Sequence, residues 1–141
     1  MADGSRARVN DSANVAAVRA LHVGAGLSRD RLWALLADDV EWYALGSPDV
    51  LPWAGTVRGH EGVRRWLAVL NEAMDYERFD LVEVVDAGDV VVEVVLGGGK
   101  AVATGKPFES EIVRIWTFRG GRAVKVRSYY DTQAYAAALA P

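Results

Sequence analysis

The chain has 141 residues, of which 51% are hydrophobic and 25% charged, so it predicts one globular domain that needs no disulfide or metal to fold. It contains no Cys and only two His, which excludes thiol catalysis, thiolate zinc sites and three-His metal sites. A formal net charge of −3 argues against a nucleic-acid binder with a broad basic surface. No apolar stretch approaches the ~20 residues that span a bilayer, and the start resembles no signal peptide. We therefore expect a cytoplasmic protein without a membrane partner.

The first half of the chain predicts mostly helices. Small polar residues indicate a loose tail over 1–11, and a single domain follows over 12–141. Asp11 or Ser12 can cap the first helix, which Gly24 and Gly26 end, and Ser28 can cap the second. Apolar residues at spacings of three to four mark one face of each helix. They are Val15, Val18, Leu21 and Ala25 in the first helix, Leu32, Trp33, Leu35 and Leu36 in the second, and Val63, Trp66, Leu67, Leu70 and Met74 in the third.

A strand and a long loop separate the second and third helices. Asp38 and Asp39 close the second helix, and a strand runs from Val40 to Leu45. Residues 46–59 contain two Pro and three Gly, which predict irregular structure. Loops this long in small domains are often binding elements.

The second half predicts strands joined by turns. Gly97–Gly99 is expected to turn the chain back, and Gly120-Gly121 to form a hairpin turn. Helices first and an antiparallel meander second predict an α+β fold, whose curled sheet leaves a hollow for a small apolar ligand. The expected elements are strands over 79–86, 90–96, 108–118 and 123–130, and a final helix over 132–139.

Three segments carry a family resemblance: LLADDVEWYALGSP (35–48), PWAG…RGHEGVRRWL (52–67) and TGKPFESEIVRIWTFRGGRAVKVRSYYDT (104–132). The chain resembles the nuclear transport factor 2-like (NTF2-like) superfamily, in particular its SnoaL-like polyketide cyclase and ketosteroid isomerase-like branch. The resemblance implies a cystatin-like α+β barrel, a cone-shaped antiparallel or mixed sheet wrapped around the N-terminal helices. Members of this family include isomerases, cyclases, epoxide hydrolases, dehydratases and binding modules, so the fold does not fix the function.

The residues argue against two mechanisms of the family. The three polar residues of ketosteroid isomerases fall on Ala20, on Ala44 or Tyr43, and near Arg114. None of these positions keeps the required group, so we do not expect steroid isomerisation by that mechanism.

The Asp-Arg-Asp set of limonene epoxide hydrolase-like members falls on Ser128 and near Val91 and Glu93, where only Glu93 could serve. A SnoaL-like cyclase needs little more than an acid/base group in an apolar pocket. This chain meets that requirement.

Arg114 and Glu93 are the main candidates for chemistry on the strands. Strand alternation places Arg114 on one face with Ile112, Trp116 and Phe118. There it either anchors a carboxylate, enolate or carbonyl oxygen or forms a structural contact. That contact would be an ion pair with Glu93 or part of a wet dimer interface. Glu93 interrupts a run of valines. It either faces the hollow, where burial would raise its pKa and suit a general acid or base, or, as we slightly favour, lies exposed.

Three further polar residues have a functional and a structural interpretation. Asp131 either accepts a proton at the pocket mouth or, as we favour, caps the last helix. His60 either shuttles protons or, again as we favour, has a structural role at a helix start. Tyr130 could donate a hydrogen bond to a substrate. His22 is expected to be a partly exposed or core residue.

The aromatic residues favour a ligand. Trp42, Trp53, Trp116, Tyr43 and Tyr130 are expected to bound a pocket for a flat apolar molecule, together with Ser128 and His60. Trp33 and Trp66 are expected to be ordinary core residues. On the outer sheet face, paired charges (Glu109, Glu111, Lys125 and Arg127) mix with apolar residues (Val113, Ile115 and Tyr129), which suits a homodimer interface.

Three functions remain open from the sequence. The first is a cofactor-free enzyme on a small hydrophobic carbonyl compound, in which Arg114 stabilises an enolate and Glu93 or Asp131 moves the proton during cyclisation, isomerisation or dehydration. The second is a non-catalytic binding protein for the same kind of molecule. The third is a dimeric interaction module. If the protein is an enzyme, we expect at least two ionisable groups to converge inside the cone. If it is a binding protein, we expect an aromatic pocket with one polar anchor, and if it is an interaction module, we expect the cone to be filled by side chains.

Overall fold

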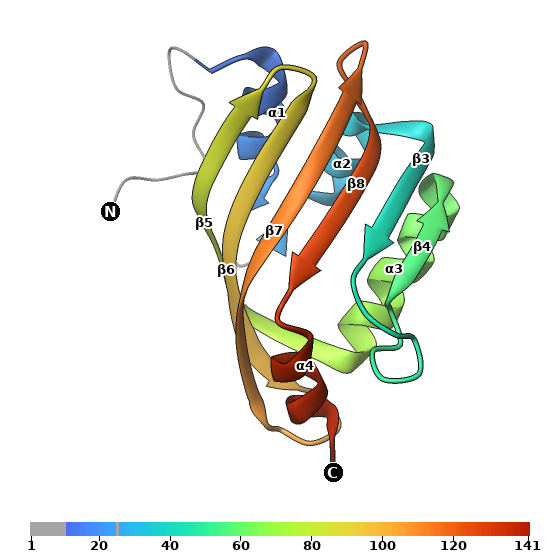
Figure 1. Ribbon diagram of the computed structural model, residues 1–141, viewed down its shortest axis with the longest axis vertical. Helices are drawn as coiled ribbons and strands as arrows, with labels where there is room; N and C mark the ends of the chain where they lie inside the picture. The colour runs from blue at the N-terminus through green and yellow to red at the C-terminus, as the bar shows by residue number, and fades with distance from the viewer. Residues whose placement is uncertain (1–10, 25) are drawn as a thin grey trace.

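The chain folds as a curved, open six-stranded sheet with helices packed against one face, shown in a computed structural model (Figure 1). The structure describes residues 11–24 and 26–141, so the expected tail before Asp11 and the helical position of Ala25 lie outside it. The sheet consists of β3 (Leu36–Ala44), β4 (Gly55–Arg58), β5 (Met74–Ala87), β6 (Val90–Ala101), β7 (Pro107–Arg119) and β8 (Arg122–Tyr130). The predicted α+β class is confirmed.

The helices surround the inner face of this sheet. They are α1 (Ala13–Ala20), α2 (Arg29–Leu35), α3 (Gly59–Ala73) and α4 (Thr132–Leu139), and a short ribbon of β1 (His22–Val23) and β2 (Gly26–Leu27) joins α1 to α2. α1 packs on β5 and β6, α3 on β3 and β4, and α4 on β6 and β7 (Figure 1). None of the helices in the described part of the chain is long and apolar enough to cross a bilayer.

The strand order is β4-β3-β8-β7-β6-β5. The pairs are antiparallel except β3 with β8, which is parallel, so the sheet is mixed. In this register Glu93 lies opposite Arg114, and Arg114 lies opposite Ser128 on its other side. Three polar residues from adjacent strands therefore meet at the middle of the inner face.

Strand alternation sets which side chains reach the interior. Along β7, Phe108, Ser110, Ile112, Arg114, Trp116 and Phe118 are buried, while the residues between them are exposed or half-buried. Along β6, Val91, Glu93 and Val95 are buried in the same way. The predicted phase of Arg114 is confirmed. The exposed position favoured for Glu93 is wrong, because the register places Glu93 opposite the buried Arg114 on the inner face.

Side-chain caps start three helices at the predicted places. Ser12 Oγ accepts from the Val15 N–H, Ser28 Oγ from the Arg31 N–H and Asp131 Oδ1 from the Ala134 N–H. Each bond satisfies a backbone donor that the first helical turn leaves unpaired.

Two boundaries differ from the sequence prediction because strand pairing extends the sheet. β3 begins at Leu36, which pairs with Ala123 of β8, so the second helix ends before Asp38. β5 begins at Met74, which pairs with Ala101, so Met74 is not helical.

The segment expected to be irregular over 46–59 is only partly so. Its last residues form β4, in which Gly55 to Arg58 pair with β3. The prolines lie earlier in the segment, where they remove no donor from this pairing.

The triple glycine does not turn the chain, which corrects the sequence prediction. Gly97–Gly99 continue β6, and the turn lies at residues 102–104. A Cβ at Gly99 would lie 1.9 Å from the Asp75 carbonyl oxygen, and one at Gly97 would lie 2.8 Å from Ile112 Cδ1. The glycines let β6 pass close to β5 and to the side chains beneath it.

Candidate functional site

A cavity of about 130 Å³ lies between the inner face of the sheet and the helices. Its size is close to the roughly 150 Å³ apolar cavity that binds benzene in another protein. The exposed residues Arg29 and Asn71 mark its mouth, between the start of α2 and the end of α3. Aromatic side chains from five elements and one loop line it: Trp42, Trp53, Trp66, Tyr76, Phe79, Tyr130 and Tyr135. The cavity therefore suits a flat ring.

Arg114 and Ser128 are the buried polar side chains of this wall, and Glu93 holds Arg114 from behind. Arg114 Nε donates to Glu93 Oε1 at 2.6 Å. The same oxygen accepts from Trp116 Nε1 at 2.9 Å, while Glu93 Oε2 accepts from His22 Nε2. Glu93 has no exposed surface, and three protein donors take the place of water around its carboxylate.

This environment lowers the pKa of Glu93 from its ordinary 4.5 to about 2. Burial by itself raises that pKa, but the positive charge of Arg114 and the contacts with His22 and Arg114 outweigh it. Glu93 is therefore ionised at neutral pH. The expectation that burial raises its pKa and suits a general acid or base is wrong, because the ion pair with Arg114, one of the alternatives expected from the sequence, and the bond from His22 stabilise the charged carboxylate.

Only Nε of the Arg114 guanidinium has a hydrogen-bond partner among the described residues. Arg114 is 5% exposed, and its Nη2 is buried with no acceptor among the described residues. Its Cζ lies 5.1 Å from the ring centroid of Phe79 and 5.7 Å from that of Trp116. Aromatic faces and a carboxylate thus fix the guanidinium at the cavity wall.

The tyrosine hydroxyls of the wall are used largely by one another and by the backbone. Tyr130 OH donates to the Leu45 carbonyl at 2.5 Å and accepts from Trp53 Nε1 at 3.0 Å, so its proton is not directed at a ligand as predicted. Tyr76 OH and Tyr135 OH share a hydrogen bond of 2.6 Å.

All three tyrosine hydroxyls stay neutral near physiological pH. Burial raises the pKa of Tyr76 to about 12 and moves the pKa values of Tyr130 and Tyr135 still higher. None of them can act as a base at neutral pH.

Several predicted site residues lie away from the cavity. Asp131 caps α4 and borders a separate surface hollow, so it cannot take a proton from a ligand in this cavity. His60 donates from Nε2 to the Leu36 carbonyl at 2.9 Å, which is the structural role that we favoured.

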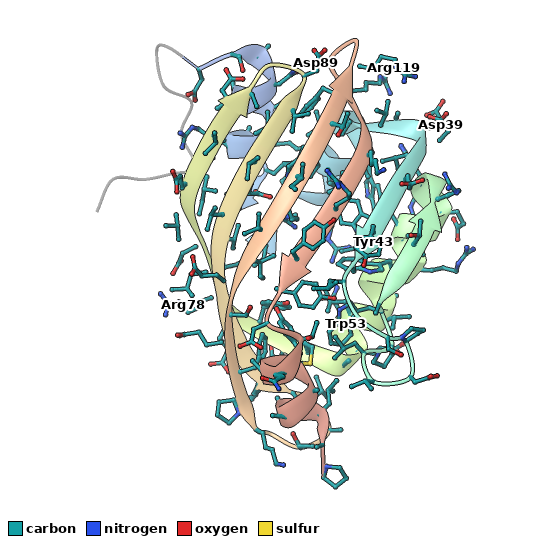
Figure 2. The ribbon with its side chains drawn as sticks, in the orientation of Figure 1. Asp39, Tyr43, Trp53, Arg78, Asp89 and Arg119 are labelled. Carbon is teal, nitrogen blue, oxygen red and sulfur yellow. The ribbon has the colours of Figure 1, made fainter. Side chains whose placement is uncertain are left out.

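Two predicted aromatic residues are also displaced from the cavity wall. Tyr43 projects from β3 (Figure 2). Its ring lies beside that of Tyr129, with ring centroids 5.9 Å apart, and it is not among the lining residues. Trp116 is fully buried behind the wall, where it binds Glu93. Trp42, Trp53, Tyr130, Ser128 and Arg114 do line the cavity as expected.

Sequence reasoning missed other members of the site. His22 is buried, binds Glu93 and stacks on Phe79, with ring centroids 5.7 Å apart. Tyr76, Phe79 and Tyr135 line the cavity, and so does Trp66, which the helical stripe had assigned to the ordinary core. Within residues 11–24 and 26–141, no three His, Cys, Asp or Glu side chains gather as metal ligands would.

The predicted outer face carries cross-strand ion pairs. Lys125 Nζ lies 3.3 Å from Glu41 Oε2, and Arg78 Nη1 lies 3.3 Å from Glu109 Oε2. Val113, Ile115 and Tyr129 are half-buried between these charges. The mixed character expected of this face is present.

Comparisons with known proteins agree with this architecture. Residues 15–126 match the model of the SnoaL-like domain family. No curated protein sequence matches significantly. An NTF2-like protein from Burkholderia pseudomallei K96243 is 25% identical over 93% of this chain and 100% of its own, with a TM-score of 0.79.

Two further solved structures are similar over almost the whole fold. An NTF2-like protein from Burkholderia xenovorans LB400 is 30% identical, with 91% of this chain and 96% of the other covered and a TM-score of 0.77. TerC, co-crystallised with polyporic acid, is 25% identical, with 91% and 98% covered and a TM-score of 0.76. The family match spans well over half of the chain and the sheet topology agrees with it. The chain therefore belongs to the SnoaL-like domain family of the NTF2-like superfamily.

Proposed function

We propose that the cavity binds a small, flat, apolar molecule through a carbonyl or enolate oxygen that accepts a hydrogen bond from Arg114. The observation that carries this proposal is the buried Nη2 of Arg114, which has no acceptor in the described structure, at the wall of an aromatic cavity. A buried donor without a partner is costly, so a ligand oxygen that satisfies it gains binding free energy.

The pairing of Arg114 with Glu93 favours an oxygen of modest charge. The carboxylate offsets the guanidinium charge at 2.6 Å, so the cavity offers a fixed donor without a large positive potential. The aromatic wall supplies the apolar contacts. TerC, whose crystals contain polyporic acid, supports the idea that a related fold holds an oxygenated organic molecule.

The test compares 1-tetralone with tetralin, which has the same two rings and no oxygen, by calorimetric or NMR titration. We expect 1-tetralone to bind about 10-fold tighter, as a hydrogen bond to a charged group predicts. Arg114→Met should abolish the difference. Because Arg114→Met removes the charged partner of Glu93, the double substitution Glu93→Gln/Arg114→Met, which also removes the charge of Glu93, is the second variant. Equal binding of both probes by the wild type would refute the role of Arg114.

A second candidate function is proton transfer next to the bound carbonyl, the step that begins cyclisation, isomerisation or dehydration. The same guanidinium favours it, because an enolate oxygen carries more negative charge than a carbonyl oxygen and is stabilised more by Arg114. The described cavity wall contains no carboxylate or imidazole, so the proton would pass to solvent at the mouth.

Deuterium exchange tests this step directly. In D2O, loss of a proton from C2 of 1-tetralone to solvent gives the enolate, and return of a deuteron removes the C2–H signal from the proton spectrum. We expect the protein to accelerate this exchange and the variant Glu93→Gln/Arg114→Met to lose the acceleration. Tight binding of 1-tetralone without faster exchange would leave binding as the function and refute catalysis of this step.

A further inference from the structure

Two tryptophans of the cavity wall carry donors with no partner. Nε1 of Trp42 and Nε1 of Trp66 are buried and have no acceptor among the described residues. Trp42 is 1% exposed and Trp66 is 9% exposed, and both side chains line the cavity. Together with Arg114 Nη2, the lining residues thus contain three buried N–H groups that the protein leaves unsatisfied.

The other tryptophans near the site show that the fold can satisfy an indole N–H. Trp53 Nε1 donates to Tyr130 OH at 3.0 Å, and Trp116 Nε1 donates to Glu93 Oε1 at 2.9 Å. Buried polar groups in folded proteins are paired in the great majority of cases. The unpaired indoles of Trp42 and Trp66 therefore indicate a partner that binds from outside the chain.

The remaining polar groups of the buried wall do not supply this partner. Tyr130 OH already accepts from Trp53, and Tyr76 OH is bonded to Tyr135 OH. The Ser128 hydroxyl and one proton of the Tyr76–Tyr135 pair remain able to donate. The interior is thus rich in donors, and it is complementary to a molecule rich in acceptors.

The donors lie on different parts of the wall. Trp42 is on β3 and Arg114 on β7, with β8 between them, so two strand spacings, or about 10 Å, separate their backbones. Trp66 reaches the same region from α3, with its ring 5.3 Å from that of Trp42 in an edge arrangement. Trp42 and Trp66 thus lie next to each other, while Arg114 reaches the cavity from a strand two positions away.

We infer that the ligand carries a second acceptor oxygen, across the same flat ring system from the oxygen that Arg114 binds, and that Trp42 and Trp66 donate to it. This inference rests on the proposed function. It names the ligand class as a quinone or a dicarbonyl compound of one or two rings. It also makes the two tryptophans specificity-determining residues, because their N–H groups distinguish two oxygens from one.

The probes are naphthalene, 1-tetralone and 1,4-naphthoquinone, which share a two-ring frame and carry none, one and two oxygens. The chain has no Cys, so it has no thiol for the quinone to alkylate. We expect affinity to rise at each step, with a roughly 2- to 12-fold gain from the second oxygen, the value of one neutral hydrogen bond. Binding is followed by the indole N–H signals of the ¹⁵N-labelled full-length protein.

The indole signals separate the donors from one another. Trp42 and Trp66 N–H should move downfield with 1,4-naphthoquinone and much less with 1-tetralone. Trp53 and Trp116 are internal references, because their N–H groups are already bonded within the protein. Trp33 is a third reference, because it packs under Arg64 away from the cavity.

Trp42→Phe and Trp66→Phe remove one N–H each while they keep an aromatic ring. Each should weaken 1,4-naphthoquinone binding roughly 2- to 12-fold more than naphthalene binding, and this difference separates the lost hydrogen bond from the packing that the smaller ring loses. Trp33→Phe is the matched control and should change neither affinity. The wild-type indole shifts keep the test valid if a variant fails to fold.

The outcomes distinguish the two proposals. If 1-tetralone binds no better than naphthalene, the role of Arg114 in the proposed function fails. If 1-tetralone binds better but 1,4-naphthoquinone adds neither affinity nor shifts of Trp42 and Trp66, the second-oxygen inference is overturned while the proposed function stands.

Discussion

Replacing Glu93 with Gln tests whether the buried carboxylate is an ionised structural partner of Arg114. Gln keeps the shape and one acceptor oxygen but removes the charge that Arg114 requires. Glu93 has no exposed surface, so the charge of Arg114 would remain in an apolar interior without compensation. Removing one partner of a buried ion pair typically costs about 3–5 kcal/mol.

The lowered pKa gives an independent magnitude. The difference between 4.5 and about 2 for the pKa of Glu93 corresponds to roughly 3 kcal/mol of folding free energy, at about 1.4 kcal/mol for each pH unit. Because the folded pKa lies below the unfolded one, this stabilisation is fully present above pH 4.5 and disappears as the pH falls toward 2. By pH 3, about 2 kcal/mol of it is lost.

Urea unfolding followed by far-UV circular dichroism measures both effects. At pH 7, Glu93→Gln should lower the free energy of unfolding by about 3–5 kcal/mol. Between pH 6 and pH 3, the wild type should lose about 2 kcal/mol more than the variant. If the variant is within about 1 kcal/mol of the wild type at pH 7 and has the same pH dependence, the ionised, paired state of Glu93 is refuted.

Three further predictions concern the frame around the site. Asp131→Ala should destabilise the protein by about 1 kcal/mol in urea and leave the affinity for 1-tetralone unchanged, since Asp131 only caps α4; weaker binding would contradict its place outside the cavity. Gly99→Ala should cost about 3 kcal/mol, because its Cβ would meet the Asp75 carbonyl oxygen at 1.9 Å, and a stability equal to the wild type would show that β5 can yield there. We expect a homodimer through the outer sheet face in light scattering, and Ile115→Glu should give a folded monomer; a wild-type monomer would exclude this interface.

The sequence predicted the phase of β7, on which the position of Arg114 depends. Apolar alternation around Arg114 placed its side chain inside, and register then brought Glu93 opposite to it. The helix caps were also predictable, because Ser28 and Asp131 act on backbone donors only three residues away. Both kinds of prediction depend on the spacing of residues close together in the chain, which can be read directly from the sequence.

Contacts between distant segments were not predictable in this way. His22 is 71 residues from Glu93, and only the ribbon between α1 and α2 brings it to the carboxylate. The pKa of Glu93 was wrong in direction because the sequence offered the pair with Arg114 only as an alternative and did not indicate the bonds from His22 and Trp116. Trp66 was assigned to the core because helical spacing marks an inward face without showing whether that face meets a cavity.

The arrangement around Glu93 also determines what kind of ligand the cavity can distinguish. A guanidinium alone in this aromatic wall would favour any anion, but the carboxylate on its Nε offsets that charge and leaves Nη2 as a fixed donor. Transfer of a ligand carboxylate from water into such a site would cost more than transfer of a carbonyl, and the gain in attraction would be small. We therefore expect the cavity to select ligands by the number and positions of the acceptor oxygens to which Arg114, Trp42 and Trp66 donate, rather than by the charge of the ligand.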